Sequence, residues 1–335
     1  MRKLAVVGAG GLVGRRVVRN LAKSDIEDLE LTLTGQGKSI GTEVAFRDAV
    51  LTVEKTEVAE LRKMDAVILC TPTNASVSLV NELRGGPVIL DTSSAFRMDP
   101  SVPLVVPEVN PQSAFGHSGL IAGPNCSTIQ LVMVLKPLLD RYGLQRVHVS
   151  TYQAVSGVGY LAIEQLSDES RAVLESRPPE GGYEPQFPHR MGFNLIPQID
   201  SFLPDGYTKE EMKMVNETKK ILGTPDLRIS TTCVRVPVYI GHSEACLVET
   251  ERPADLDSVR EVLAASPGIL VKDDPLNSVY PMPVDAAHTD EVYVGRIRKD
   301  LSSRTGILMW IVADNLYRGA ATNAVNVFRL LAKGM

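Results

Sequence analysis

The segment LAVVGAGGLVGRRVVRNL, residues 4–21, decides the first half of the fold. Its four leading apolar residues are typical of a buried strand, and apolar residues recur at helical spacing after the glycines. A strand, a glycine turn and a helix in this order form the phosphate-binding unit of a dinucleotide-binding domain. We therefore predict that a nucleotide binds at the N-terminus of the helix, where unpaired backbone N–H groups attract phosphate.

The individual glycines of this segment have separate expected roles. Gly8 permits the tight turn, Gly10 or Gly11 lets the backbone approach a pyrophosphate, and Gly14 allows the helix to pack closely on the strand. Such a fingerprint is weak evidence alone, but its position directly after a strand strengthens it.

The next predicted strand, 29–33, ends where a nucleotide site reads the adenosine ribose. A site for NAD usually places Asp or Glu there, whereas this chain has Thr34-Gly35-Gln36-Gly37-Lys38-Ser39. A cation and a hydroxyl, Lys38 and Ser39, favour the 2′-phosphate of NADP. The alternative is that Lys38 is only a solvated loop charge.

Further short apolar runs alternate with helical or loop segments and predict a mostly parallel, doubly wound sheet. These runs are 66–70, 88–91, 104–106 and 120–122. Ligands of such sheets bind beyond the carboxyl ends of the strands. Arg97 and Cys126 both fall at such ends, so we expect them to share a crevice with the glycine loop.

The second half of the chain has longer alternating strands, which predict a largely antiparallel or mixed sheet with helices on one face, an α+β domain. The predicted strands include 147–151, 227–238, 245–249 and 291–297, and the Pro- and Gly-rich stretch 177–188 is expected to be a surface excursion. We predict two domains, residues 1–126 with 314–335 and residues 127–313. A last helix, 314–332, with Ala320, Ala324, Val327 and Leu331 along one side, is expected to pack back onto the first domain.

Cys126 lies in Gly123-Pro124-Asn125-Cys126-Ser127-Thr128, between a strand-like and a helix-like run. A thiol at a helix N-terminus has a lowered pKa and becomes a nucleophilic thiolate near neutral pH. The alternative is a buried cysteine that only packs. Cys70, Cys233 and Cys246 lie in apolar runs and fit that alternative better.

Charged residues of the second half offer acid, base and anion-binding groups. Glu210, Lys213 and Glu217 share one face of a helix that we expect to begin at a capping box at Thr208 and end near Gly223, and the pattern alone favours a solvated face.

Arg235 and His242 are seven residues apart, so a straight strand would place them on opposite faces. If both serve one site, the chain must bend or bulge near Pro237 or Gly241.

Composition excludes several classes of protein. A length of 335 residues with 44% hydrophobic and 22% charged residues fits two globular domains. The net charge of -5 without a basic stripe argues against nucleic acid as a partner. Four cysteines without CxxC spacing and five scattered histidines indicate neither disulfides nor a metal site.

The chain carries no expected targeting or membrane segment. The charged and then apolar start, 1–7, is interrupted at once by glycines, so we reject a signal peptide. The apolar run 307–313 is far shorter than the roughly 20 residues of a membrane span. We expect a cytoplasmic protein without a membrane partner.

Together these motifs resemble the aspartate-β-semialdehyde dehydrogenase family over nearly the whole chain. The resemblance rests on 8–14, on 123–128, on Cys233-Val234-Arg235-Val236-Pro237 with Gly241-His242, and on Phe187-Pro188-His189, 194–200 and Ala313-Asp314-Asn315-Leu316. It implies a Rossmann-type domain joined to a catalytic and dimerisation domain, as in glyceraldehyde-3-phosphate dehydrogenase.

The resemblance also implies the roles of particular residues. Cys126 would be the nucleophile, His242 the acid/base, and Gln153 the group that orients the intermediate. Arg235 would bind the substrate α-carboxylate and Glu210 its amino group. The remaining implied residues are Arg97, Asn125 and Lys213 for phosphate, and Gly8, Gly10, Gly11, Leu12, Val13, Lys38, Ser39, Ser156, Gly157 and Asn315 for NADP.

The implied reaction reduces L-aspartyl 4-phosphate with NADPH to L-aspartate 4-semialdehyde and phosphate, a step toward lysine, diaminopimelate, threonine and methionine. His242, with an ordinary pKa near 6.5, would move protons in both directions, and its imidazolium would favour the thiolate. The implied assembly is a homodimer or a dimer of dimers.

The chain departs from the family at two positions of the cofactor site. Relatives usually carry Thr at the position of Gly10 and Arg at that of Lys38. Lysine keeps the charge but lacks the bidentate fork, so the preference for NADP over NAD is expected to be weaker.

Two other classes remain open at this stage. One is another phosphorylating reductase, such as N-acetyl-γ-glutamyl-phosphate reductase or a glyceraldehyde-3-phosphate dehydrogenase-like enzyme. The other is a catalytically silent, NADP-binding regulatory protein, which the presence of Cys126, Gln153, Arg235 and His242 in one chain argues against.

Overall fold

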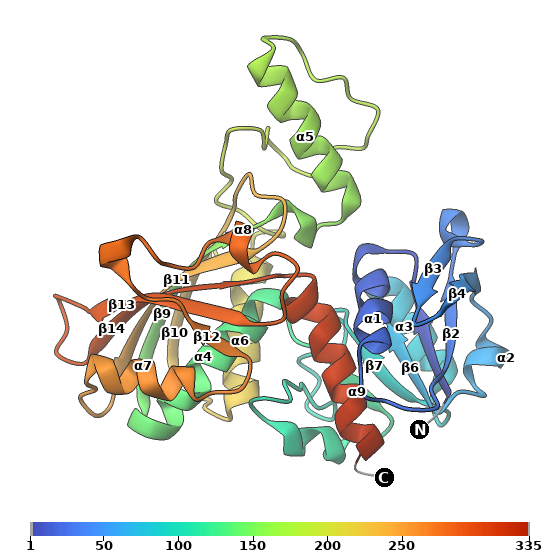
Figure 1. The fold of residues 1–335 in the computed structure, drawn as a ribbon, viewed down its shortest axis with the longest axis horizontal. Helices are drawn as coiled ribbons and strands as arrows, with labels where there is room; N and C mark the ends of the chain where they lie inside the picture. The colour runs from blue at the N-terminus through green and yellow to red at the C-terminus, as the bar shows by residue number, and fades with distance from the viewer. Residues whose placement is uncertain (1–2, 334–335) are drawn as a thin grey trace. The chain divides into compact units, whose positions relative to one another are not determined.

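The fold was analysed in a computed structural model, which describes residues 3–333 (Figure 1). It divides into two compact units, Met1–Asn125 with Gly319–Met335, and Cys126–Arg318. This division places Cys126 and 314–318 in the second unit, and the domain limits 1–126 with 314–335 and 127–313 stay a prediction. The predicted outer limits, 1 and 335, lie outside the described residues.

The first unit contains a six-stranded sheet in which every pairing is parallel, so the predicted doubly wound sheet is confirmed. Its strands, in spatial order, are β5 (Glu54–Lys55), β2 (Glu30–Gly35), β1 (Lys3–Val7), β6 (Ala66–Leu69), β7 (Val88–Asp91) and β8 (Leu120–Ala122). A separate hairpin consists of β3 (Glu43–Phe46) and β4 (Ala49–Thr52), and two short 3-10 turns are η1 (Gly37–Ser39) and η2 (Pro111–Gly116).

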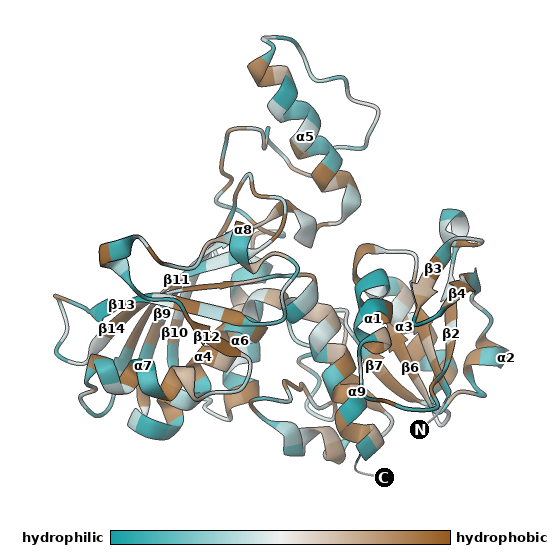
Figure 2. Cartoon of the chain, in the orientation of Figure 1, coloured by the Kyte–Doolittle hydropathy of each residue, from teal (hydrophilic) through white to brown (hydrophobic). Residues whose placement is uncertain are grey.

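Helices cover both faces of this sheet. Successive side chains of a strand point to opposite faces, so Leu4 and Val6 of β1 pack in one core, and Ala5 and Val7 pack in the other. The first core includes α1 (Leu12–Ala22) and α9 (Asn323–Lys333), and the second includes α2 (Val58–Leu61) and α3 (Thr73–Leu83). Figure 2 shows β6 and β7 coloured as hydrophobic, as strands buried on both faces require.

The prediction of a strand at 104–106 was wrong. Residues 104–106 form only an isolated parallel bridge, Leu104 to Ala122. Asn110 stops the strand, because its side chain donates to the Leu104 carbonyl and accepts from the Val106 N–H.

The last helix begins later than predicted. Asp314 accepts hydrogen bonds from the N–H groups of Leu316 and Tyr317, a π-helical turn η5 spans Tyr317–Thr322, and α9 starts at Asn323. The extra residue in a π turn shifts the helical register. Ala321 rather than Ala320 therefore joins Ala324, Val327 and Leu331 in the core of the first unit.

The second unit contains a mixed six-stranded sheet, as predicted. Its spatial order is β10 (Arg228–Arg235), β9 (Leu144–Gln153), β11 (His242–Thr250), β14 (Gly306–Ala313), β13 (Val292–Lys299) and β12 (Ile269–Val271). β9 and β10 are parallel, whereas β11 runs antiparallel to both β9 and β14.

Helices of the second unit lie mainly on one face of its sheet. α4 (Cys126–Tyr142) contacts β9, β11, β13 and β14, and α6 (Lys209–Leu222) and α7 (Leu256–Ala264) pack beside it. The remaining elements are η3 (Val155–Gly157), α5 (Tyr160–Leu174), η4 (Pro275–Asn277) and α8 (Pro283–Ala286). The stretch after α5 is mostly exposed and lies away from the sheet, as predicted for 177–188 (Figure 1).

The predicted strand 227–238 ends at Arg235, three residues early. Proline has no N–H to continue a ladder, and Pro237 lies just beyond this point. The chain crosses the end of β9, where Val155 and Ser156 donate to the carbonyls of Val238 and Tyr239, and returns as β11. Gly241, with φ of +98°, makes the turn. The predicted bend near Pro237 or Gly241 is therefore confirmed.

Candidate active site

A cavity of about 820 Å³ lies at the carboxyl ends of the first unit's strands, where ligands of doubly wound sheets bind. Five of the residues predicted to bind the cofactor line it, namely Gly8, Gly10, Gly11, Lys38 and Ser39. Leu12 and Val13 instead begin α1 and do not line the cavity.

The glycines form a cradle that a side chain would fill. Gly8 has φ of +81°, and a Cβ at Gly14 would lie 2.2 Å from the Gly8 carbonyl oxygen. A Cβ at Gly10 would lie 2.6 Å from the Ser39 Cβ. These positions fit the close approach of a dinucleotide backbone, and a side chain at Gly10 would collide with Ser39.

Sequence reasoning missed Arg15 and Gln36 in this cavity. Arg15 follows the glycine loop on α1 and donates from Nε to the Gly10 carbonyl at 3.0 Å. Its guanidinium adds a second cation to the cavity besides Lys38. The sequence did contain a signal for Arg15, because a basic residue in the first turn of the helix can reach back to the glycine loop.

Arg97 and Asn125 are both buried in the first unit. Arg97 donates from Nε to the Gly123 carbonyl at 2.9 Å and from Nη2 to the Thr92 carbonyl at 3.0 Å. Its guanidinium thus holds the loop that leads to Cys126.

The second unit gathers its predicted site residues at one end of its sheet. Parallel β9 and β10 end side by side at Gln153 and Arg235, which are register partners. Antiparallel β11 begins at the same end with His242, which is paired with Ala313 of β14. Topology alone therefore brings together residues that are far apart in sequence.

The peptide of Ala154 joins Arg235 to His242. Its N–H donates to His242 Nδ1 at 2.9 Å, and its carbonyl accepts from Arg235 Nη1 at 2.7 Å. Gly157 lies against both side chains, since a Cβ there would be 3.2 Å from Arg235 Nη1 and 3.4 Å from His242 Nε2. Arg235 and His242 therefore converge in spite of their odd spacing.

Cys126 is the first residue of α4 and is half-buried. Burial lowers the pKa of Arg235, and the charges of Glu210 and Cys126 oppose that shift, so the thiol and the guanidinium interact electrostatically. By contrast, burial raises the pKa of Cys70 to about 12 and that of Cys246 further. Among the four cysteines, only Cys126 stands at a helix N-terminus.

Glu210 and Lys213 lie on a face of α6 that is not solvated, so the interpretation favoured by pattern alone was wrong. Glu210 is 5% exposed and accepts from Gln153 Nε2 at 3.2 Å and from Lys213 Nζ at 3.2 Å. Lys213 also pairs with Asp200 at 2.8 Å. The capping box at Thr208 and Glu211 and the C-cap at Gly223 confirm the predicted helix ends.

Asn315 and Ser156, predicted cofactor residues, contact each other in the second unit. The Asn315 amide donates to Ser156 Oγ at 3.0 Å, and its carbonyl oxygen accepts from the Gly241 N–H at 3.0 Å. This bond ties Asn315 to the turn that positions His242.

The pKa expected for His242 was wrong. The side chain is fully buried, and burial, with a smaller effect of Arg235, lowers its pKa well below 6.5. Because Nδ1 accepts the Ala154 N–H, the proton of the neutral ring lies on Nε2. The structure thus disfavours an imidazolium at this position.

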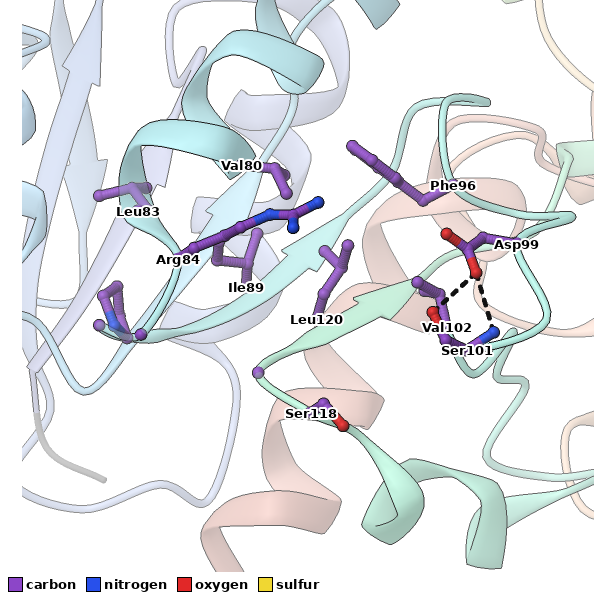
Figure 3. Close-up of a pocket in the computed structure, with 14 residues that line it drawn as sticks. Val80, Leu83, Arg84, Ile89, Phe96, Asp99, Ser101, Val102, Ser118 and Leu120 are labelled. Carbon is purple, nitrogen blue, oxygen red and sulfur yellow. Dashed lines mark hydrogen bonds between the residues drawn. The ribbon is translucent and has the colours of Figure 1, made fainter.

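A second cavity of the first unit, about 320 Å³, lies at the amino ends of β7 and β8 (Figure 3). Arg84 lies across it near Val80 and Ile89, and Asp99 accepts from the Ser101 N–H. This is the end opposite the glycine loop, so it is separate from the cofactor cavity.

Two family models match the chain. The model described as "Semialdehyde dehydrogenase, NAD binding domain" matches residues 3–117, and the model described as "Semialdehyde dehydrogenase, dimerisation domain" matches residues 135–318. The class of the protein is therefore that of the semialdehyde dehydrogenases.

Relatives narrow this class. The aspartate-semialdehyde dehydrogenase of Aquifex aeolicus is 46% identical, covering 99% of this chain and 98% of its own. The crystal structure of aspartate semialdehyde dehydrogenase II of Vibrio cholerae, complexed with ASA, is 39% identical with a TM-score of 0.95, over 99% of this chain and 98% of that one. The Candida albicans enzyme, crystallised with NADP, is 25% identical with a TM-score of 0.74, over 99% and 98%. The chain belongs to the aspartate-semialdehyde dehydrogenase family.

Residues 3–333 contain neither a candidate membrane span nor a candidate metal site. No helix there is long and apolar enough to cross a membrane, and no cluster of three or more His, Cys, Asp and Glu could hold a metal ion.

The lowered pKa of His242 predicts a pH-dependent stability. The unfolded chain protonates this ring below about pH 6.5, whereas the folded protein keeps it neutral, so stability falls as the pH falls from 6.5 toward the folded pKa, by at most about 1.4 kcal/mol per pH unit. Urea unfolding between pH 8 and 5.5 should therefore show a smaller loss in His242→Asn than in the unchanged protein. Exposed His189→Asn is the control and should keep the original slope. Equal slopes in all three proteins would contradict this assignment.

Proposed function

We propose that this protein reduces L-aspartyl 4-phosphate to L-aspartate 4-semialdehyde with NADPH and releases inorganic phosphate. The observation that carries the proposal is the convergence of Arg235 and His242 on the Ala154 peptide and Gly157, in a member of this family that matches 98% of the length of a relative. The reaction belongs to the synthesis of lysine, diaminopimelate, threonine and methionine.

The nucleophile in this proposal is the Cys126 thiolate, stabilised by the N-terminus of α4 and by the charge of Arg235. Sγ attacks the acyl carbon, the tetrahedral intermediate expels phosphate, and a thioester remains. Collapse of the reduced thiohemiacetal later returns the thiolate and releases the aldehyde.

His242 presents Nε2–H to the reacting group, since Nδ1 is held by Ala154. We infer that this N–H donates to the oxygen that carries the developing negative charge, and that the acid/base role of His242 operates at Nε2. The buried Gln153 amide, held by Glu210, orients the same intermediate.

The substrate clamp is formed by charges of opposite sign. Arg235 donates to the Ala154 carbonyl through Nη1, and the rest of its planar fork would suit the substrate α-carboxylate. Glu210 would hold the α-ammonium, and Lys213 with Arg97 and Asn125 would hold phosphate. Glu210 is buried, and its charge acts on Arg235, the proposed partner of the substrate α-carboxylate. This arrangement favours a substrate with a free amine over an N-acetylated one.

The cofactor residues fall in two groups. Gly8, Gly10, Gly11, Lys38 and Ser39 line the cavity of the first unit, and Leu12 and Val13 begin the helix whose N-terminus would face the pyrophosphate. Ser156, Gly157 and Asn315 would serve the nicotinamide end. When bound, NADPH supplies the hydride that reduces the thioester.

Three broader proposals complete this function. Residues 1–126 with 314–335 form the NADP-binding domain, and residues 127–313 form the catalytic and dimerisation domain. The protein acts as a homodimer, or as a dimer of dimers, in the cytoplasm.

Replacing the nucleophile tests the mechanism. With aspartate semialdehyde, phosphate and NADP, the unchanged protein should form NADPH, and Cys126→Ala should lower kcat by at least about a thousandfold, because covalent catalysis is lost. Cys246→Ala, which removes a packing thiol, should retain most of the activity. Similar rates for Cys126→Ala and the unchanged protein would refute the role of this thiol.

A larger residue at Gly157 tests whether Arg235 and His242 converge there. Gly157→Ala places a methyl group within 3.2 Å of Arg235 Nη1 and 3.4 Å of His242 Nε2, so kcat/KM should fall about tenfold to a hundredfold. Gly116→Ala meets no atom within 4 Å and is the matched control. Steady-state kinetics that are equal for the two variants would refute this geometry.

Cofactor preference is expected to depend on charge. Lys38→Met should raise KM for NADPH about tenfold and leave KM for NADH nearly unchanged, because only the former carries the 2′-phosphate. Lys63→Met, outside the cavity, controls for net charge. An equal rise of both KM values would show that Lys38 does not read the phosphate.

A further inference from the structure

Gln130 connects the helix of the nucleophile to the strand of the acid/base. It lies on α4 four residues after Cys126, so its side chain leaves the same face of the helix one turn on. Its Nε2 donates to the His242 backbone carbonyl at 3.4 Å, a long bond. The side chain is 1% exposed, so water does not replace that contact.

Glu244 lies beside this connection on β11. It follows His242 by two residues and therefore projects from the same face of the strand. The residue is completely buried, and it has no role in the mechanism described above. A buried carboxyl of this kind needs a partner or must give up its charge.

Three polar atoms at this point lack a hydrogen-bond partner within the part of the chain that is described. They are both carboxyl oxygens of Glu244 and the carbonyl oxygen Oε1 of Gln130. As a carboxylate, Glu244 has only acceptors, so it could engage Gln130 Nε2 but would leave Gln130 Oε1 without a donor.

One proton on Glu244 would satisfy all three atoms. The carboxyl O–H would donate to Gln130 Oε1, and the carboxyl carbonyl would accept the second hydrogen of Gln130 Nε2. The first hydrogen of Nε2 would remain on the His242 carbonyl. The result is a reciprocal acid–amide pair with no unpaired atom.

The surroundings favour the neutral acid. The groups that act electrostatically with Glu244 are the thiols of Cys246 and Cys233, and its register partner on β9 is Thr151. No cation pairs with this carboxyl among residues 3–333. Burial raises the pKa of Glu244 well above 4.5, and the nearby Gln130 amide only partly opposes that effect.

We propose that Glu244 and Gln130 are positioning residues that form a neutral acid–amide pair between α4 and β11 and thereby hold the Cys126 thiol in reach of His242. The effect on turnover rests on the proposed function. The existence of the pair does not.

Substitutions can separate positioning from simple filling of space. Glu244→Gln can form the same reciprocal pair, so kcat should stay within about threefold. Glu244→Leu should lower kcat about tenfold to a hundredfold with KM little changed, because small misplacements of reacting groups cost this much. In Glu244→Leu with Gln130→Leu no polar atom of the pair remains, so the urea midpoint should recover while kcat stays low.

Two measurements test the neutral acid without any turnover. The infrared absorption of a protonated carboxyl should be present in the unchanged protein and lost in Glu244→Gln. The unfolded chain ionises Glu244 above about pH 4.5 while the folded protein keeps it protonated, so Glu244→Gln should raise the urea midpoint at pH 8 and leave it unchanged at pH 4.

Each proposal can fail separately. Full activity of the double leucine variant, or an equal loss of kcat in Glu244→Gln and Glu244→Leu, would overturn the positioning role. Absence of the carboxyl band and of the pH-dependent midpoint shift would overturn the neutral pair. An unchanged protein that lacks dehydrogenase activity but shows both signatures would overturn the proposed function and keep the pair.

Discussion

The catalytic end of the second unit depends on one peptide group, that of Ala154. Its N–H orients the His242 ring, and its carbonyl binds the Arg235 guanidinium, so two side chains from strands on either side of β9 are held by the residue that directly follows β9. A backbone group is well suited to this task because β9 itself is fixed by ladders on both edges. No side-chain substitution at Ala154 removes either bond, although proline would remove the N–H.

The turn between β10 and β11 makes this arrangement possible. β9 and β10 are parallel, whereas β11 runs antiparallel to β9. The chain must therefore reverse direction after β10, and only residues 236–241 are available for this crossing. Pro237 ends the ladder, and Gly241 adopts a positive φ while its N–H donates to Asn315. A Cβ at Gly241 would lie 3.0 Å from Pro283, so glycine is required there for space as well as for conformation.

The sequence predicted most strands, the glycine cradle and the ends of α6, because these follow from local periodicity and capping. It could not predict that the charged face of α6 is buried, since burial of Glu210 depends on Gln153, which is 57 residues away. The pattern at 104–106 misled for a similar reason, because Asn110 stops the strand through side-chain bonds that periodicity does not encode. Arg15, Ala154 and Glu244 were missed because their significance lies in partners rather than in spacing.

The tautomer of His242 changes how the thiolate must be generated. A ring whose Nδ1 accepts a backbone N–H carries its proton on Nε2 when neutral, so it cannot take the thiol proton at Nε2 without becoming a buried cation beside Arg235. In the proposed mechanism, the α4 N-terminus and the Arg235 charge would therefore be the groups that stabilise the Cys126 thiolate. A substrate phosphate would partly neutralise the local positive charge, and only then would an imidazolium become less costly. In the proposed mechanism, the burial that lowers the pKa of His242 would thus link its protonation to the binding of an anionic substrate.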